Sequence, residues 1–163
     1  TGAGVKPGAT THFSWRNDNM SVYKPFNHQH LAEISRSIAS LEPEFTSDAI
    51  NFVPVRGDFA RGIFCMAHFA CDLNQEEAEK LYADYYRNQP FTIVSSSPVD
   101  LKQAVNTNKA VISLHADSKK KRLLVTSVID NLLKGASGQA VQNFNLMFGL
   151  DPKAGLKLKP SAF

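Results

Sequence analysis

Two closely spaced histidines, His28 and His30, are the first residues of this chain that could do chemistry. Imidazole changes its charge near neutral pH, so either ring could act as a general acid or base. Glu33 follows His30 by three residues, and residues at that spacing share one face of a helix. Two other interpretations stay open: the histidines are ordinary polar residues at the start of a helix, or they bind a metal ion together with His115.

A second candidate group is Arg61, which lies beside a turn between two predicted strands. A guanidinium group binds phosphate or carboxylate through two parallel hydrogen bonds, which makes Arg61 a candidate anion clamp. The alternative is an arginine that is only a surface charge next to a turn.

The third candidate is the small-residue run Gly135-Ala136-Ser137-Gly138. It lies between a predicted strand that ends at Ile129 and a helix that begins directly after the run. Such a turn brings backbone N–H groups and a helix N-terminus close to a ligand, and it suits phosphate, carboxylate or amide recognition. The structural alternative is a strand-to-helix turn that needs small residues for packing.

Hydrophobic periodicity predicts the elements that must position these residues. Apolar residues recur at helical spacing in residues 28–41, which predicts a helix that ends before Pro43. Residues 50–55 and 60–71 are rich in β-branched and aromatic side chains, which predicts two strands joined by residues 56–58. The first half of the chain therefore reads as a helix followed by a strand pair.

The run Asn74-Gln75-Glu76-Glu77 resembles a capping box and predicts the start of a second helix. The apolar residues expected on one face of that helix are Ala78, Leu81, Tyr82 and Tyr85. A short strand is expected at residues 91–94, followed by a loop at residues 95–98.

Two longer strands are expected at residues 110–115 and 123–129. The basic run between them, residues 119–122, fits a solvated hairpin turn better than a nucleic-acid patch. The final helix carries an apolar stripe made by Ala140, Val141, Phe144, Met147 and Phe148. The pattern as a whole is of the α+β class.

Several of these motifs together resemble the C-terminal part of N-acetyl-γ-glutamyl-phosphate reductases, which are NADP-dependent enzymes of arginine biosynthesis related to aspartate-semialdehyde dehydrogenases. The resemblance is closest in residues 130–150, which contain Asp-Asn-Leu, Lys-Gly-Ala-Ser-Gly-Gln and Val-Gln-Asn. Residues 28–34 resemble the motif His-Arg-His-Thr-Pro-Glu-Ile, although Gln29 replaces the arginine. Residues 52–63 resemble a strand pair that ends in Arg-Gly-Ile, and Thr1-Gly2-Ala3-Gly4 resembles the end of a Ser-Gly-x-Ser-Gly-Ala-Gly run.

The resemblance implies a large mixed, mostly antiparallel sheet with helices on one face, as in the C-terminal domain of glyceraldehyde-3-phosphate-dehydrogenase-like enzymes. It implies that residues 1–134 form a substrate-binding and dimerisation domain and that residues 135–163 form a helix and tail that pack on an NADP-binding domain. It also implies a small-molecule substrate and assembly as a homodimer or homotetramer.

The same resemblance assigns roles to individual residues. His28 is the expected acid and base, because this motif places a histidine beside the catalytic thiol in the family. The expected substrate-binding residues are His30, Glu33, Arg61, Tyr23 and Lys24. The expected cofactor contacts, to the nicotinamide of NADP or through the active-site loop, are Asn131, Gly135 and Ala136. No metal is expected.

The family's NADP-binding fingerprint and its Asn-Pro-Gly-Cys nucleophile motif are not found in this sequence. We therefore expect the chain to be part of a longer enzyme and to be inactive alone, because the acyl-phosphate reduction would pass through a thioester on that cysteine. The alternative from another class is a non-catalytic dimerising module that binds an acyl-amino-acid-like ligand or a partner subunit.

Composition excludes several other classes of protein. The 163 residues are 43% hydrophobic and 20% charged, with a mild net charge of +3, as in an ordinary globular domain. We expect neither a nucleic-acid nor a membrane partner, since no apolar run approaches the length of a membrane span.

Cys65 and Cys71 would lie roughly 20 Å apart on one strand, too far for a disulfide. Buried, reduced thiols would fit a cytoplasmic protein.

Overall fold

The computed structural model describes residues 5–6 and 8–160. The Thr1-Gly2-Ala3-Gly4 run therefore lies outside the described residues. Contacts within the chain divide it into two compact units, residues 1–60 and residues 61–163.

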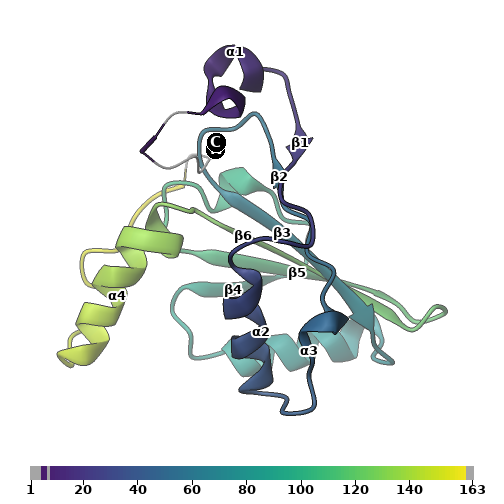
Figure 1. The fold of residues 1–163 in the computed structure, drawn as a ribbon. Helices are drawn as coiled ribbons and strands as arrows, with labels where there is room; N and C mark the ends of the chain where they lie inside the picture. Colours follow the sequence, from purple (N-terminus) through teal and green to yellow (C-terminus); the bar gives the residue numbers. More distant parts are fainter. Residues whose placement is uncertain (1–4, 7, 161–163) are drawn as a thin grey trace. The chain divides into compact units, whose positions relative to one another are not determined.

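The helices and strands follow one another as Figure 1 shows. The α-helices are α1 (Phe13–Arg16), α2 (Leu31–Ala39), α3 (Gln75–Tyr86) and α4 (Gly138–Met147). The strands are β1 (Ser21–Val22), β2 (Val55–Arg56), β3 (Ile63–Ala70), β4 (Thr92–Ser95), β5 (Ala110–Asp117) and β6 (Arg122–Ile129). Short 3₁₀ turns occur at Ala9–Thr11, Ser47–Ala49 and Leu101–Gln103, and a π-helical turn occurs at Leu133–Ser137.

The first unit is held together by polar contacts more than by an apolar core. Its strands β1 and β2 pair antiparallel, with Ser21 opposite Arg56. Arg16 is buried in this unit. It donates hydrogen bonds to the carbonyl oxygens of Thr10 and Arg56 and to the Ser21 hydroxyl. Because Arg16 ties α1 to both strands, it replaces the hydrophobic contacts that a larger unit would use.

Two boundaries predicted for this unit are wrong. The helix predicted over residues 28–41 begins only at Leu31, and His28 lies in the turn before it. The strand predicted over residues 50–55 is reduced to Val55–Arg56, and it pairs with β1 and not with β3. The apolar residues of 50–53 lie in an irregular segment, where their composition had resembled a strand.

The second unit is built on a four-stranded sheet in the order β3-β6-β5-β4 (Figure 1). β6 pairs antiparallel with both β3 and β5, and β4 joins β5 in parallel. The tight hairpin between β5 and β6 contains the basic run, which confirms the predicted turn. This mixed, mostly antiparallel sheet with helices confirms the predicted α+β class.

One face of the sheet is covered by α3. The side chain of Asn74 accepts the N–H of Glu77 while Glu77 accepts the N–H of Asn74, so the predicted capping box is present. Ala78 is completely buried against inward residues of β5 and β6. The predicted apolar face is partly wrong, because Leu81 and Tyr85 are exposed. Tyr86 packs against the core together with the predicted Tyr82.

The opposite face carries a second, smaller core. It contains the buried side chains of Val99, Ala104, Val111 and Val128, with Leu101 packed against them. Because side chains alternate along a strand, neighbouring residues of β5 supply both cores. This second core anchors the loop before β5 at the end of the sheet where β6 ends.

Helix α4 has its polar side turned inward. Asn145 is buried, and its amide nitrogen donates to the carbonyl oxygens of Pro152 and Ala154 in the tail. The predicted apolar stripe is exposed, with Phe144 at 54% and Met147 at 81% of their full accessible surface. An exposed stripe of this size marks a surface that a partner usually covers.

The two cysteines differ in their exposure to solvent. Both cysteines of the described part of the chain are free, but Cys65 is exposed, so its predicted burial is wrong. No helix among the described residues is long and apolar enough to cross a membrane.

Candidate active site

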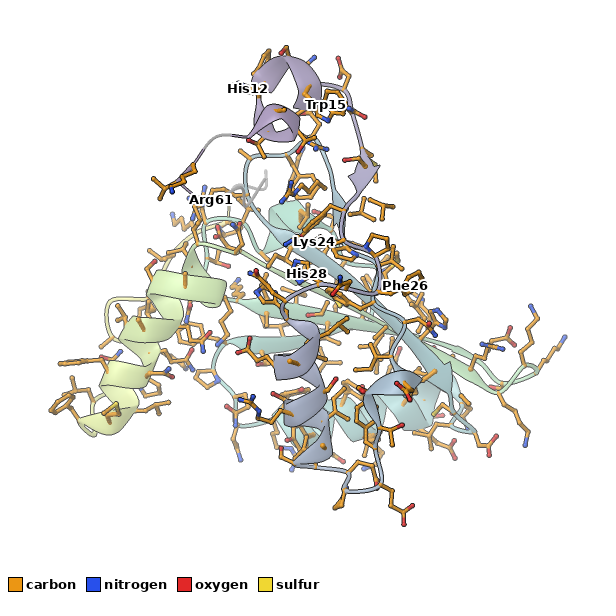
Figure 2. All side chains as sticks on the ribbon, viewed as in Figure 1. His12, Trp15, Lys24, Phe26, His28 and Arg61 are labelled. Carbon is orange, nitrogen blue, oxygen red and sulfur yellow. The ribbon has the colours of Figure 1, made fainter. Side chains whose placement is uncertain are left out.

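His28 lies at the centre of an aromatic and basic cluster within the first unit. Its ring meets the rings of Tyr23, His30 and Phe52 at centroid distances of 5.3, 4.7 and 5.5 Å. Figure 2 shows Lys24 and His28 on the segment that leads into α2. The turn that contains His28 is closed by the hydrogen bond from the Leu31 N–H to the His28 carbonyl oxygen.

The hydrogen bonding of His28 fixes the position of its proton. Nδ1 accepts the backbone N–H of His30 at 3.2 Å. A nitrogen that accepts a hydrogen bond carries no proton, so the proton of the neutral ring lies on Nε2. Partial burial lowers the pKa of His28 from 6.5, and the neighbouring groups lower it further: His30, Lys24 and Arg56. Near neutral pH, His28 is therefore a hydrogen-bond donor through Nε2.

Arg56 belongs to the same cluster, although the sequence did not identify it. Its guanidinium lies 4.1 Å from the centroid of the Tyr23 ring, a stacked cation–π contact. The sequence placed Arg56 only in a turn between strands. Arg56 could have been selected only if the pairing of β1 with β2 had been predicted, because that pairing brings residues 21–22 beside residues 55–56.

The other predicted residues of this unit are distributed around His28. Tyr23 contacts both His28 and Arg56, and His30 contacts the His28 ring. Lys24 is exposed and has a positive φ of 45°. Glu33 lies exposed in the first turn of α2.

Arg61 forms a hydrogen bond and an ion pair with side chains of the second unit, to which it belongs. One terminal nitrogen, Nη1, donates to the Asn106 side-chain oxygen at 2.9 Å, and the other, Nη2, lies 2.9 Å from the Asp130 carboxylate. Arg61 has five N–H donors in all, and these contacts leave the second N–H of Nη1 unused, so they restrict an anion at this guanidinium without excluding it. The contacts give Arg61 a role that the sequence did not predict, which is to connect the start of β3 to the loop before β5 and the end of β6.

Asp130 is the residue that organises the end of β6, and sequence reasoning did not select it. Its buried carboxylate accepts the N–H groups of Asn106, Leu132 and Leu133 as well as the Arg61 guanidinium. Burial alone would raise the pKa of Asp130, but the three backbone donors and Arg61 outweigh it and hold the pKa below 3.8. The carboxylate therefore stays ionised and fixes the first turn of the small-residue run.

The residues predicted to contact the cofactor lie in the turn that follows Asp130 in the chain. Asn131 uses its side-chain oxygen to accept the Gly62 N–H at 2.7 Å, which attaches the turn to the start of β3. The Gly135 N–H donates to the Asp130 carbonyl oxygen, so it is occupied inside the turn. Gly135 and Ala136 are exposed. The predicted helix after the turn is present as α4.

A polar network lies beneath the start of α4. The Gln142 side-chain oxygen accepts hydrogen bonds from the Asn108 amide at 3.1 Å and from the Lys134 ammonium at 2.8 Å. Partial burial lowers the pKa of Lys134. Lys134, which the sequence left open as a solvated residue, thus helps to attach the turn to the helix.

The metal interpretation gains no support from the arrangement of side chains. Within residues 5–6 and 8–160, no group of three or more His, Cys, Asp or Glu side chains is placed to hold a metal ion. His28, His30 and His115 therefore do not form a metal centre among these residues.

Comparison with known proteins identifies close relatives. Residues 1–131 match the family described as semialdehyde dehydrogenase, dimerisation domain. Over all 163 residues the chain is 56% identical to a protein of Parabacteroides distasonis and 57% identical to one of Phocaeicola vulgatus. It is 53% identical to one of Flavobacterium johnsoniae. All three are named N-acetyl-gamma-glutamyl-phosphate reductase, and the chain spans about half of their length, 49–50%.

Proposed function

The chain belongs to the semialdehyde dehydrogenase dimerisation-domain family, and from this we propose that it is the substrate-binding and dimerisation part of an N-acetyl-γ-glutamyl-phosphate reductase. The proposed reaction converts N-acetyl-γ-glutamyl phosphate into N-acetylglutamate semialdehyde and phosphate, a step of arginine biosynthesis. The observation that carries the proposal is the His28 cluster in a chain more than half identical to proteins of that name.

His28 is the proposed acid. When an acyl phosphate is reduced, negative charge develops on the carbonyl oxygen, and a donor aimed at that oxygen stabilises it. The proton on Nε2 of His28 is available for this purpose, since Nδ1 is occupied by the His30 N–H. For His28 to take a proton from a thiol through Nε2, this hydrogen bond would first have to open. The hydrogen bond therefore favours the acid role over the base role.

The thiol of the proposed thioester would come from another part of the longer protein. Cys65 and Cys71 do not fill this role in our proposal. Cys65 lies on β3 of the second unit, and although the residue is exposed, the partial shielding of its sulfur from water raises the pKa of the thiol, which makes it a poor nucleophile. A catalytic thiol needs the opposite shift.

The substrate contacts of the proposal are assigned within each unit separately. Tyr23, Lys24, His30 and Glu33 are its candidates around His28. Arg61 remains a separate candidate through the N–H of Nη1 that is not bonded to Asn106.

NADP is the proposed cofactor, and its hydride would reduce the acyl carbon. The turn after β6 fits an amide ligand in one respect, because the side-chain nitrogen of Asn131 makes no hydrogen bond to other described residues while its oxygen is fixed on Gly62. That nitrogen could donate to the nicotinamide carboxamide. Gly135 and Ala136 would offer exposed backbone beside it.

We further propose assembly as a homodimer or homotetramer, in line with the dimerisation family. The exposed apolar residues of β3 support an interface on the sheet.

The two free cysteines support a reducing compartment such as the cytoplasm.

The decisive experiment is an assay of the full-length protein that contains this chain. We expect it to form NADPH from N-acetylglutamate semialdehyde and NADP only when phosphate is present. The 163-residue chain alone should form none. A full-length protein without this activity would contradict the proposed function, whereas activity in the isolated chain would contradict the assignment of thiol and cofactor binding to the rest of the protein.

A further inference from the structure

We propose that Arg56 binds an oxyanion of the substrate beside His28. The inference rests on the proposed function for the identity of the substrate. It assigns the anion-binding role to a residue that neither the motifs nor the comparisons select. The ligand chemistry is a carboxylate or phosphoryl group, and the experiment below distinguishes the two.

The guanidinium of Arg56 is held beside His28 by the Tyr23 ring. The central carbon of the Arg56 guanidinium lies over the Tyr23 ring at 4.1 Å from its centroid, and Tyr23 in turn lies edge-on to His28 with a centroid distance of 5.3 Å. A stacked guanidinium keeps its N–H edges free for hydrogen bonds. The stack also holds the group in one orientation, so less conformational entropy is lost when an anion binds.

The side chains around His28 carry mostly positive charge. Arg56, Lys24, His28 and His30 form a group of cationic or imidazole side chains. Among the described residues, no carboxylate lies within ion-pair distance of Arg56 or Lys24. A half-buried cationic group without a carboxylate attracts an anion from solution. Arg61 differs from Arg56 in this respect, because the charge of Arg61 is already paired with Asp130.

The backbone beside this cluster adopts an unusual conformation. Lys24 and Phe26 have φ values of 45° and 58°, in the left-handed region that residues with side chains rarely adopt. The Phe26 N–H donates to the Phe52 carbonyl oxygen, and Phe52 packs against His28. The strained segment is thus held in place by the residues that surround His28. Such strain persists where a local geometry is needed.

The experiment measures Arg56→Lys and Arg56→Ala in the full-length enzyme, assayed as semialdehyde oxidation with phosphate and NADP. We expect KM for one anionic reactant to rise about 10-fold or more with Arg56→Ala, and less with Arg56→Lys, while kcat changes little. A rise in KM for the semialdehyde identifies the carboxylate. A rise in KM for phosphate identifies the phosphoryl group.

The matched control is Arg36→Ala, which removes an exposed arginine from α2 in the same unit. It should leave both KM values unchanged. Unchanged KM values in both Arg56 variants would overturn the proposal. Arg56→Lys keeps the charge and a side chain over Tyr23, so it remains informative if Arg56→Ala does not fold.

A binding measurement separates this inference from the proposed function. Calorimetric titration of the full-length protein with N-acetylglutamate and with inorganic phosphate needs no turnover. Weaker binding of either probe by the Arg56 variants supports the anion site, even if the wild-type protein lacks reductase activity. Equal binding by variant and wild type, or no binding of either probe by the wild type, refutes the anion site and leaves the reductase proposal standing.

Discussion

The guanidinium of Arg61 and the carboxylate of Asp130 lie 2.9 Å apart, and their exposures differ sharply. The Asp130 side chain is completely buried, whereas that of Arg61 keeps 32% of its accessible surface. The buried partner also accepts three backbone N–H groups. Removing Asp130 should therefore harm the protein more than weakening Arg61, because buried donors would then be left without an acceptor.

Asp130→Asn should lower the free energy of unfolding by about 3 kcal/mol, since an amide replaces a carboxylate that faces four donors. Urea unfolding followed by circular dichroism measures this change. Asp84→Asn is the matched control, because Asp84 is an exposed acid on α3 that pairs with Lys80 and Arg87. An Asp130 variant as stable as the control would show that the buried contacts contribute little.

The stability difference at Asp130 should depend on pH. Its pKa in the folded chain is lower than 3.8, so its contribution is fully present above that value and is lost as the pH falls through the folded pKa. The difference between wild type and Asp130→Asn should accordingly be constant from pH 7 to about 5 and shrink below about 4. A difference that stayed constant down to pH 2 would contradict an ionised Asp130.

Arg61→Lys should reduce stability while leaving KM close to the wild-type value. A lysine keeps the charge beside Asp130 but cannot reach Asn106 and Asp130 together with a planar fork. Thermal unfolding and steady-state kinetics on the same full-length variant decide the question. A large rise in KM with unchanged stability would restore Arg61 as the anion clamp.

His28→Ala in the full-length enzyme should lower kcat by about 10²-fold or more, the usual contribution of a positioned acid or base. His30→Ala should cost less, because the hydrogen bond to Nδ1 of His28 comes from the His30 backbone, which the substitution keeps. Steady-state kinetics with a circular dichroism check of folding provide the measurement. Near-normal kcat in a folded His28→Ala enzyme would remove His28 from the mechanism.

Gly138→Ala should be destabilising, whereas Gly135→Ala should be tolerated. A Cβ at position 138 would lie 2.4 Å from the Asn108 side-chain oxygen and 3.0 Å from the backbone of Leu133, so the helix start would have to move. At position 135 the nearest atoms are 3.6 Å away, an ordinary contact. We expect a loss of roughly 1–3 kcal/mol for Gly138→Ala, measured by urea unfolding. Equal stability of the two variants would contradict the close packing.

The sequence predicted best the elements with strong local signals. The capping box at Asn74, the β5–β6 hairpin and the strand-to-helix turn after Ile129 are all present. Each depends on neighbours within a few residues, where hydrogen bonding and side-chain alternation determine the conformation. The apolar stripe on one side of α4 was also predicted, because the positions of its residues follow from helical spacing alone.

The sequence predicted the long-range contacts less well. Arg56 reaches the His28 cluster only because β2 pairs with β1 across more than 30 residues of chain. Asp130 was passed over because its importance comes from donors in two separate segments. The helix start at Leu31 was misjudged because His28 and His30 carry no capping signal that marks the boundary.

Strand β3 forms one edge of the four-stranded sheet, and all eight of its residues are exposed. Its sequence, Ile-Phe-Cys-Met-Ala-His-Phe-Ala, contains none of the lysines, acids or prolines that protect natural edge strands from misassembly. Such a strand can template the addition of strands from other chains, correct or not. β3 is therefore the place in this sheet where pairing with strands of other folding chains is expected, so its exposure makes the uncovered domain prone to aggregation.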